Sequence, residues 1–173
     1  MDSLHKLEDK IEVWLKPFPH LPPNWRKWLS ENVWWLVLIG VILSVIGTIM
    51  LAMLVITAMS AVSTVTNVYG AYGVNIGQTY TGMWYLSTLI SVVFLVVTIV
   101  IEAIAISPLK TQNKKGWDLM FLAYLIGILS SVVSAVLTLT IVNLFSAVIG
   151  AVIGAYFLFE VRSYFKQAAI VKK

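Results

Sequence analysis

Glu102 is the first candidate for a functional residue, because it is an acidic side chain in a chain that keeps charge out of long stretches. No Asp, Glu, Lys or Arg occurs from Asn32 to Ile101 or from Leu119 to Phe159. Ionisable side chains are costly inside a bilayer and are functional candidates there. Glu102 lies about one turn before the predicted end of its helix, so a structural ion pair with Arg162 is the simpler interpretation. Proton or ion handling is the alternative.

Hydroxyl side chains form the second group of candidates, and they are spread through the uncharged stretches. Such residues could line a hydrophilic path, but they also hydrogen-bond their own helix or a neighbouring one. Their spacing selects no single continuous stripe. The residues are Ser44, Thr48, Ser91, Thr98, Ser130, Ser131 and Ser134.

Catalytic chemistry has little support in the sequence. The predicted membrane interior contains no His, Cys, Asp, Lys or Arg, and the two histidines, His5 and His20, lie near the N-terminus. The chain has no cysteine, which excludes disulfides, iron–sulfur clusters and thiolate metal sites. We find no phosphate-binding glycine loop and no catalytic serine elbow. The sequence therefore predicts a non-enzymatic protein without catalytic residues, cofactor or metal site.

Small residues spaced by four indicate a helix-packing face near the C-terminus. Residues four apart lie on one side of a helix, and in lipid small side chains let helix backbones approach closely. Packing within one chain and contact with another chain are both compatible with this pattern. The predicted face consists of Ser146, Ala147, Gly150, Ala151, Gly154 and Ala155.

The composition indicates an integral membrane protein of 173 residues. Sixty per cent of the residues are hydrophobic and 12% are charged, whereas about 25% are charged in a typical soluble domain. About 20 apolar residues span a bilayer, so each uncharged stretch must fold back at least once. We predict an all-α fold with four transmembrane helices, at about 33–59, 83–106, 118–137 and 143–162.

The connections between these spans are predicted from their polarity. A loop over 63–82 contains four glycines, and Pro108 is expected just beyond the second span. The third and fourth spans are expected to turn between Thr138 and Asn143. A re-entrant hairpin that does not cross the bilayer remains an alternative for this pair. The resulting division is an interfacial segment over 1–31, a transmembrane domain over 32–163 and a basic tail over 164–173.

The N-terminal segment has the pattern of an amphipathic helix in the membrane interface. Leu4, Leu7, Ile11, Trp14 and Phe18 recur every three or four residues, with charged residues between them. Pro22 and Pro23 are expected to open a second short helix. A helix that binds a partner is the alternative. Tryptophans favour the headgroup level, and the predicted interfacial anchors are Trp14, Trp25, Trp28, Trp34, Trp35, Trp84 and Trp117.

The basic residues predict the orientation of the chain. All 12 lysines and arginines lie in the N-terminal segment, the linker between the second and third spans, or the C-terminal end. With four crossings these regions share one side, which the positive-inside rule makes cytoplasmic. We expect a multi-pass protein of the plasma (inner) membrane with both termini in the cytoplasm. The basic pI of about 9.3 then reflects contact with anionic lipid, and no nucleic-acid partner is expected.

The sequence does not specify a particular activity. The expected function is association in the bilayer, either with further copies of the chain or as an accessory subunit of a membrane complex. The alternative is a small channel or transporter subunit for an ion or a small solute. Polar residues that converge on a shared axis of the oligomer would favour the alternative, and dry contacts between small residues at that axis would favour association.

Overall fold

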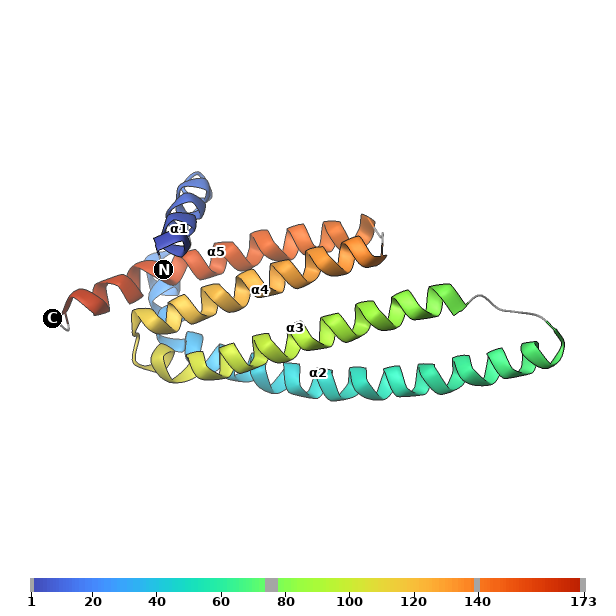
Figure 1. Cartoon of the computed structure of the whole chain (residues 1–173). Coiled ribbons are helices and arrows are strands. Elements are labelled where there is room, and N and C mark those ends of the chain that lie inside the picture. Colours follow the sequence, from blue (N-terminus) through green and yellow to red (C-terminus); the bar gives the residue numbers. More distant parts are fainter. Residues whose placement is uncertain (1, 74–77, 139–140, 172–173) are drawn as a thin grey trace.

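A computed structural model describes residues 2–73, 78–138 and 141–171 of the chain. Over these ranges the chain forms five α-helices and no strand (Figure 1). The helices are α1 (Asp2–Leu15), α2 (Pro23–Ala71), α3 (Gln78–Lys110), α4 (Lys114–Thr138) and α5 (Ile141–Val171). Four helical segments are long and apolar enough to span a membrane: Pro23–Ala71, Leu86–Lys110, Lys114–Leu137 and Phe145–Phe165.

The helix α2 is longer than the sequence predicted at both of its ends. It begins at Pro23 and continues into the first predicted span, so the separate short helix expected after Pro22 is wrong. Side chains that hydrogen-bond to the preceding turn accompany this continuity: Ser30 donates to the Lys27 carbonyl at 2.7 Å and Asn32 to the Trp28 carbonyl at 2.9 Å. At 1.5 Å per residue, α2 is roughly 73 Å long.

The loop predicted over 63–82 is also wrong, because α2 continues to Ala71 and α3 already begins at Gln78. Polar residues here do not break the helix, since their hydroxyls bond back to it. Ser60 donates to the Thr57 carbonyl at 2.8 Å, and Thr64 donates to the Ser60 carbonyl at 2.9 Å. The helix stops only where Gly73 takes a positive φ of 75°. The part of this region over 74–77 lies outside the described residues.

The turn between α3 and α4 brings two helix ends unusually close. Pro108 lies inside the last turn of α3, not beyond the helix as predicted. The Asn113 side chain accepts a hydrogen bond from the Lys115 amide at 3.0 Å, as an N-cap residue does. A Cβ atom at Gly116 would lie 2.6 Å from the Leu109 nitrogen and 2.8 Å from the Pro108 carbonyl carbon. Only glycine therefore fits this position without a backbone shift.

The helices α2 to α5 run along a common direction, and α1 projects from one end (Figure 1). Backbones approach closely between α3 and α4, α2 and α3, α4 and α5, α2 and α5, and α1 and α5. Within the described helices, α3 and α5 make no such approach. We call the end with Lys110, Lys114, Glu160 and Arg162 the charged end, and the opposite end, where α4 meets α5, the far end. The sequence predicted a turn between Thr138 and Asn143; α4 ends at Thr138, but α5 already begins at Ile141, and residues 139–140 lie outside the described residues.

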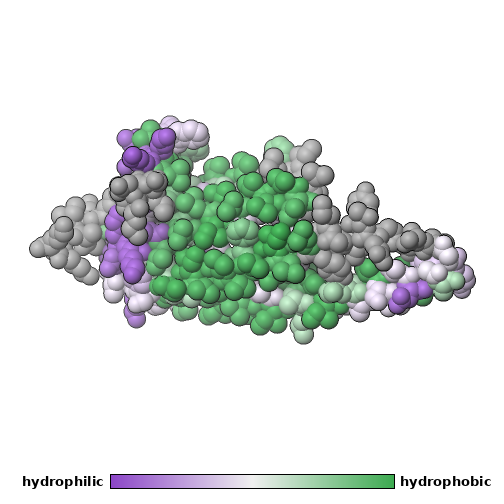
Figure 2. All heavy atoms as spheres, in the orientation of Figure 1, coloured by the Kyte–Doolittle hydropathy of each residue, from purple (hydrophilic) through white to green (hydrophobic). Residues whose placement is uncertain are grey.

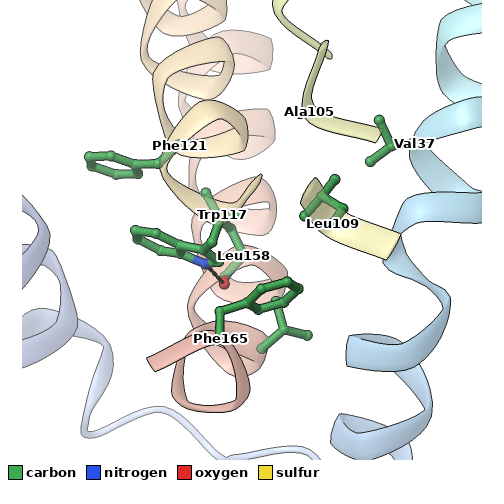
Figure 3. Close-up of a cluster of buried hydrophobic side chains, with 8 residues drawn as sticks. Val37, Ala105, Leu109, Trp117, Phe121, Leu158 and Phe165 are labelled. Carbon is green, nitrogen blue, oxygen red and sulfur yellow. Dashed lines mark hydrogen bonds between the residues drawn. The ribbon is translucent and has the colours of Figure 1, made fainter. Parts of the chain in front are cut away.

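The buried core lies toward the charged end (Figure 3). The indole nitrogen of Trp117 donates a hydrogen bond to the Leu158 carbonyl at 2.9 Å. The ring of Trp117 stacks on Phe121 with a centroid distance of 5.3 Å. The hydrogen bond from Trp117 to Leu158 joins α4 to α5, and other core residues extend the cluster to α2 and α3. The core consists of Val37, Ala105, Leu109, Trp117, Phe121, Leu158, Val161 and Phe165.

The surface separates into bands along the bundle. Figure 2 shows a broad hydrophobic belt around the middle, with hydrophilic residues gathered at the charged end. The belt includes many exposed large apolar side chains, among them Leu43, Met53 and Leu89. Such a belt is the surface that lipid chains would contact if the four candidate spans crossed a bilayer.

Candidate functional site

Three helices surround a cleft of about 420 Å³ that is lined by Glu102 and by most of the small-residue face predicted from the sequence. The helix α4 forms its floor, and α3 and α5 form its two walls. Glu102 and Thr98 contribute from α3, and Tyr124 and Ser131 from α4. From α5 come Ser146, Ala147, Gly150, Ala151 and Gly154, which are five of the six residues of the predicted small-residue face.

The polar groups of this cleft have used their hydrogen-bond donors on helix backbone. Thr98 donates to the Phe94 carbonyl at 2.9 Å, and Ser131 donates to the Gly127 carbonyl at 2.9 Å. The Tyr124 hydroxyl donates to the Ala151 carbonyl at 2.6 Å and so joins the floor of the cleft to the α5 wall. A hydroxyl that has donated its hydrogen still has acceptor capacity. These three side chains therefore offer the cleft oxygen acceptors.

A second cleft of about 410 Å³ adjoins the first one and is lined largely by serines. It shares Ser131, Ser146 and Ala147 with the first cleft and adds Ser91, Ser130 and Ser134. Ser91 and Glu102 are separated on α3 by about 16 Å of helix axis, at 1.5 Å per residue. The structure thus brings together hydroxyl residues whose spacing in the sequence selected no continuous stripe.

The small-residue face of α5 is divided between a packed half and an open half. Ala155 is 7% exposed, and a Cβ atom at Gly154 would lie 3.0 Å from the Tyr124 ring. At Gly150, by contrast, an added Cβ would meet nothing within 4 Å, and Ser146 is exposed. The packed half contacts α4 within the chain, and the open half faces the cleft.

Glu102 lies in the α3 wall of the cleft, half-buried, and has no hydrogen-bond or ion-pair partner among the described residues. The expected ion pair with Arg162 is not formed: in the described part of the chain, Arg162 forms its ion pairs with α1 instead. The α3 helix also runs to Lys110, so Glu102 lies about two turns from the helix end and not one.

Arg162 is the centre of an ion-pair cluster that the sequence did not predict. Its side chain is 5% exposed, and its guanidinium contacts Glu8 at 2.8 Å, Asp9 at 3.0 Å, and Glu12. Glu8 is itself 1% exposed. The guanidinium also lies over the Trp117 ring, 5.3 Å from its centroid. Charge-assisted hydrogen bonds of this kind are strong and geometrically specific, so the cluster fixes α1 to α5.

A second cluster with the opposite charge pattern lies two residues away on α5. Glu160, which is 4% exposed, contacts His20 at 2.8 Å and Arg26 at 2.9 Å. The Tyr156 hydroxyl, one turn earlier, donates to the Pro19 carbonyl at 2.7 Å. The connection between α1 and α2 is therefore held to α5 by the same stretch of helix that holds α1.

The clusters also determine which side of α1 faces the bundle. Glu8 is buried, while Leu7 is 40%, Val13 58% and Trp14 82% exposed. The acidic side of α1 faces α5, and much of the apolar stripe faces away from it. A signal for this orientation is present in the sequence, since Glu8 and Glu12 are four residues apart and therefore lie on one face of the helix.

The predicted tryptophan anchors differ in their surroundings. Trp14, Trp25, Trp28 and Trp35 are exposed, whereas Trp34 is partly buried beneath Lys110 at 5.3 Å. Trp117 is only 1% exposed and belongs to the core, so its assignment as an interfacial anchor is corrected. The side chain of Trp84 lies outside the described residues. No set of three metal-ligating side chains occurs in the described ranges.

No family model matches the sequence, and no curated protein and no solved structure matches the chain. The class of the protein therefore comes from its own geometry. Over its described residues it is an all-helical protein with four candidate membrane-spanning helices and a cleft between three of them.

Proposed function

We propose that the protein is a non-enzymatic integral membrane protein that acts through helix–helix association in the bilayer. The observation that carries this proposal is the open half of the small-residue face. Ser146 and Gly150 lie on the α5 wall of a cleft, and α3 does not approach α5 to close it. Lipid chains pack poorly against such a polar and small-residue surface, whereas another helix backbone approaches it closely.

The partner we propose first is a second copy of the chain, and a different membrane subunit is the alternative. The test is Gly150→Leu, compared with Gly47→Leu on α2. Both glycines have nothing within 4 Å of an added Cβ, so both positions have open space next to the helix. We expect the wild type to be larger than its 19.2 kDa monomer by light scattering in mild detergent. Gly150→Leu should reduce that size and Gly47→Leu should not.

Two results would contradict self-association. One is a wild type that is monomeric at all protein concentrations, and the other is a Gly150→Leu variant that assembles like the wild type. Co-purification of a different membrane protein that is lost in Gly150→Leu would identify the partner as another subunit. The far-ultraviolet circular dichroism spectrum of each variant should equal that of the wild type, which shows that each variant keeps its helical fold.

The orientation that we propose follows the basic residues, with both termini and the α3–α4 turn in the cytoplasm and the protein in the plasma (inner) membrane. The chain contains no cysteine, so single cysteines report accessibility cleanly. Cysteines at Gln78 and Lys114 should be labelled from opposite sides of sealed vesicles. Labelling of both from one side would show that α3 does not cross and would contradict four crossings.

At the charged end we propose that α1 lies on anionic lipid. Its acidic side chains face Arg162, so the surface that remains combines exposed Trp14 and Val13 with exposed Lys6 and Lys10. Apolar side chains flanked by lysines are typical of helices that bind the interface of anionic membranes. We propose no nucleic-acid partner for this basic surface.

A second candidate function is supported by the convergence of polar residues in the two adjoining clefts. A small channel or transporter subunit would need such a path, from Glu102 past Ser131 to Ser91. Proteoliposomes tested for K⁺ and proton flux with entrapped dyes would examine this function. Flux that is lost in Glu102→Gln with unchanged stability would support it, and the absence of both fluxes in the wild type would contradict an ion path.

A further inference from the structure

The polar groups that line the cleft with Glu102 are complementary to a cation and not to an anion. Thr98, Tyr124 and Ser131 have donated their hydrogens to backbone carbonyls, so they present oxygen acceptors to the cleft. Among the described lining residues there is no Lys, Arg or His. A negatively charged ligand would find no charged partner here, whereas a positively charged ligand would find the Glu102 carboxylate.

The size and the remaining lining indicate an organic ligand. The volume of about 420 Å³ lies within the range of small-molecule sites, which are mostly apolar with a few placed polar groups. Met120, Ile128 and Leu158 supply apolar contacts. A bare inorganic cation would need many oxygen ligands at short range, and these walls do not concentrate oxygens in that way.

The open side of the cleft gives such a ligand a route of entry. Because α3 and α5 do not approach each other, the space between them is reached from the side of the bundle. A molecule with an apolar body and one positive charge partitions into membranes. It would meet in this cleft a carboxylate that has no partner within the described chain.

We propose that the cleft between α3, α4 and α5 binds a monovalent organic cation, an apolar molecule with one ammonium group that pairs with Glu102. This inference goes beyond association, because it concerns the α3 and α4 sides of the cleft and a small molecule. The ammonium group would pair with the α3 wall, and a second copy of the chain would contact the α5 wall at Ser146 and Gly150, so the two partners would share one cleft.

The experiment compares two probes of similar shape, 4-phenylbutylammonium and its uncharged counterpart 4-phenylbutan-1-ol. The protein is placed in nanodiscs of zwitterionic phosphatidylcholine, and binding is measured by calorimetry with empty nanodiscs subtracted. We expect the wild type to bind the ammonium at least tenfold more tightly than the alcohol. Glu102→Gln should weaken ammonium binding at least tenfold and leave alcohol binding unchanged.

Matched variants separate the site from general electrostatics and from unfolding. Glu31→Gln removes an exposed carboxylate of α2 and should leave ammonium binding unchanged. Gly127→Leu extends into the cleft from a position with nothing within 4 Å of an added Cβ. Gly127→Leu should therefore block binding of the ammonium in a folded protein. This variant keeps the test possible even if Glu102→Gln were too unstable to measure. Gly47→Leu, which places a leucine outside the cleft, is the control for Gly127→Leu.

Equal affinity for the ammonium and the alcohol would overturn the proposal, and so would ammonium binding that survives in both Glu102→Gln and Gly127→Leu. Light scattering on the same samples tests association separately. A monomeric wild type that binds the ammonium would contradict association alone. An assembled wild type that does not bind it would contradict the cation site alone.

Discussion

At the charged end of the bundle the helices close around Trp117 and Phe121, whereas toward the far end α3 and α5 stand apart on either side of serine side chains. Trp117 and Phe121 are 1% and 0% exposed, and two ion-pair clusters hold the N-terminal segment against α5 beside them. In the second cleft, most lining residues are serines. The first end is stabilised by large rings and charge, and the second is left accessible.

The difference indicates how one small bundle can combine a stable fold with an accessible surface. Aromatic packing and ion pairs at one end fix the relative positions of α2, α4 and α5. The clefts farther along therefore do not need dense side-chain packing to keep their shape. Residues that would destabilise a core, such as Glu102 and Ser131, are placed where that stabilisation is not required.

The largest predicted effect compares two phenylalanines from the two regions. Phe121→Ala should lower the free energy of unfolding by about 3–5 kcal/mol, because it leaves a cavity in the core. Phe145 is 66% exposed near the start of α5, and Phe145→Ala should change stability by less than about 0.5 kcal/mol. Unfolding in mixed detergent micelles measures both. Equal losses would remove the distinction between the two ends.

The second predicted effect concerns the cluster around Arg162. Arg162→Met leaves the buried Glu8 carboxylate without its guanidinium partner. The free energy of unfolding should fall by about 3 kcal/mol, which is the lower end of the range for breaking a buried ion pair. The loss is at the lower end because Asp9 and Glu12 remain partly hydrated. Lys115→Met, which removes an exposed lysine, should cost almost nothing. Limited proteolysis should cut α1 faster in Arg162→Met than in either the wild type or Lys115→Met.

A double-mutant cycle identifies the partner of Arg162. Arg162→Met combined with Glu8→Gln should cost clearly less than the sum of the two single changes, since the residues are in contact. Arg162→Met combined with Glu102→Gln should be additive. Coupling of Arg162 to Glu102, with no coupling to Glu8, would support the ion pair between Arg162 and Glu102 that the sequence suggested.

The third predicted effect tests the close approach at the α3–α4 turn. A methyl group at Gly116 would meet the backbone of Leu109 at 2.6 Å, so Gly116→Ala should cost about 1–3 kcal/mol, as overpacking does. Gly127→Ala on the same helix has open space and should be neutral or slightly stabilising, since alanine favours helix. A Gly116→Ala variant as stable as the wild type would show that the turn relaxes freely.

The smallest predicted effect is at Ser131 in the clefts. Its hydroxyl bonds to the carbonyl four residues earlier in its own helix, and such bonds contribute little to helix stability. Ser131→Ala should therefore change the free energy of unfolding by less than about 0.5 kcal/mol. A loss comparable to that of Gly116→Ala would mean that the serines hold the bundle together, and the two ends would then be alike in their packing.

Much of the fold could be predicted from charge and polarity alone. The uncharged stretches imposed four apolar helices, and the polar cluster after Thr138 located the break between α4 and α5. The helix ends were less predictable. Ser60 and Thr64 look like loop residues in the sequence, but they continue α2 because their hydroxyls bond to its backbone.

The candidate site could be predicted only in part. Spacing by four placed Gly150 and Gly154 on one face, but it could not show that Tyr124 packs against Gly154 and leaves Gly150 open. The sequence indicated that Arg162 is a paired cation, but it did not identify the partners. These partners lie about 150 residues away on α1, and the sequence does not specify from which direction α1 approaches α5. Such long-range pairing depends on how helices cross, and helical periodicity carries no information on that.

The pairing of Glu8 with Arg162 also has a consequence for biosynthesis. The carboxylates of α1 are translated before their partner on α5, since Glu8 and Arg162 are 154 positions apart. Chains are synthesised from the N-terminus, so α1 has no Arg162 guanidinium to dock against until α2, α3, α4 and part of α5 have been made. A nascent chain interrupted before α5 would carry an undocked N-terminal helix, with its acidic residues exposed where quality-control proteases could recognise them.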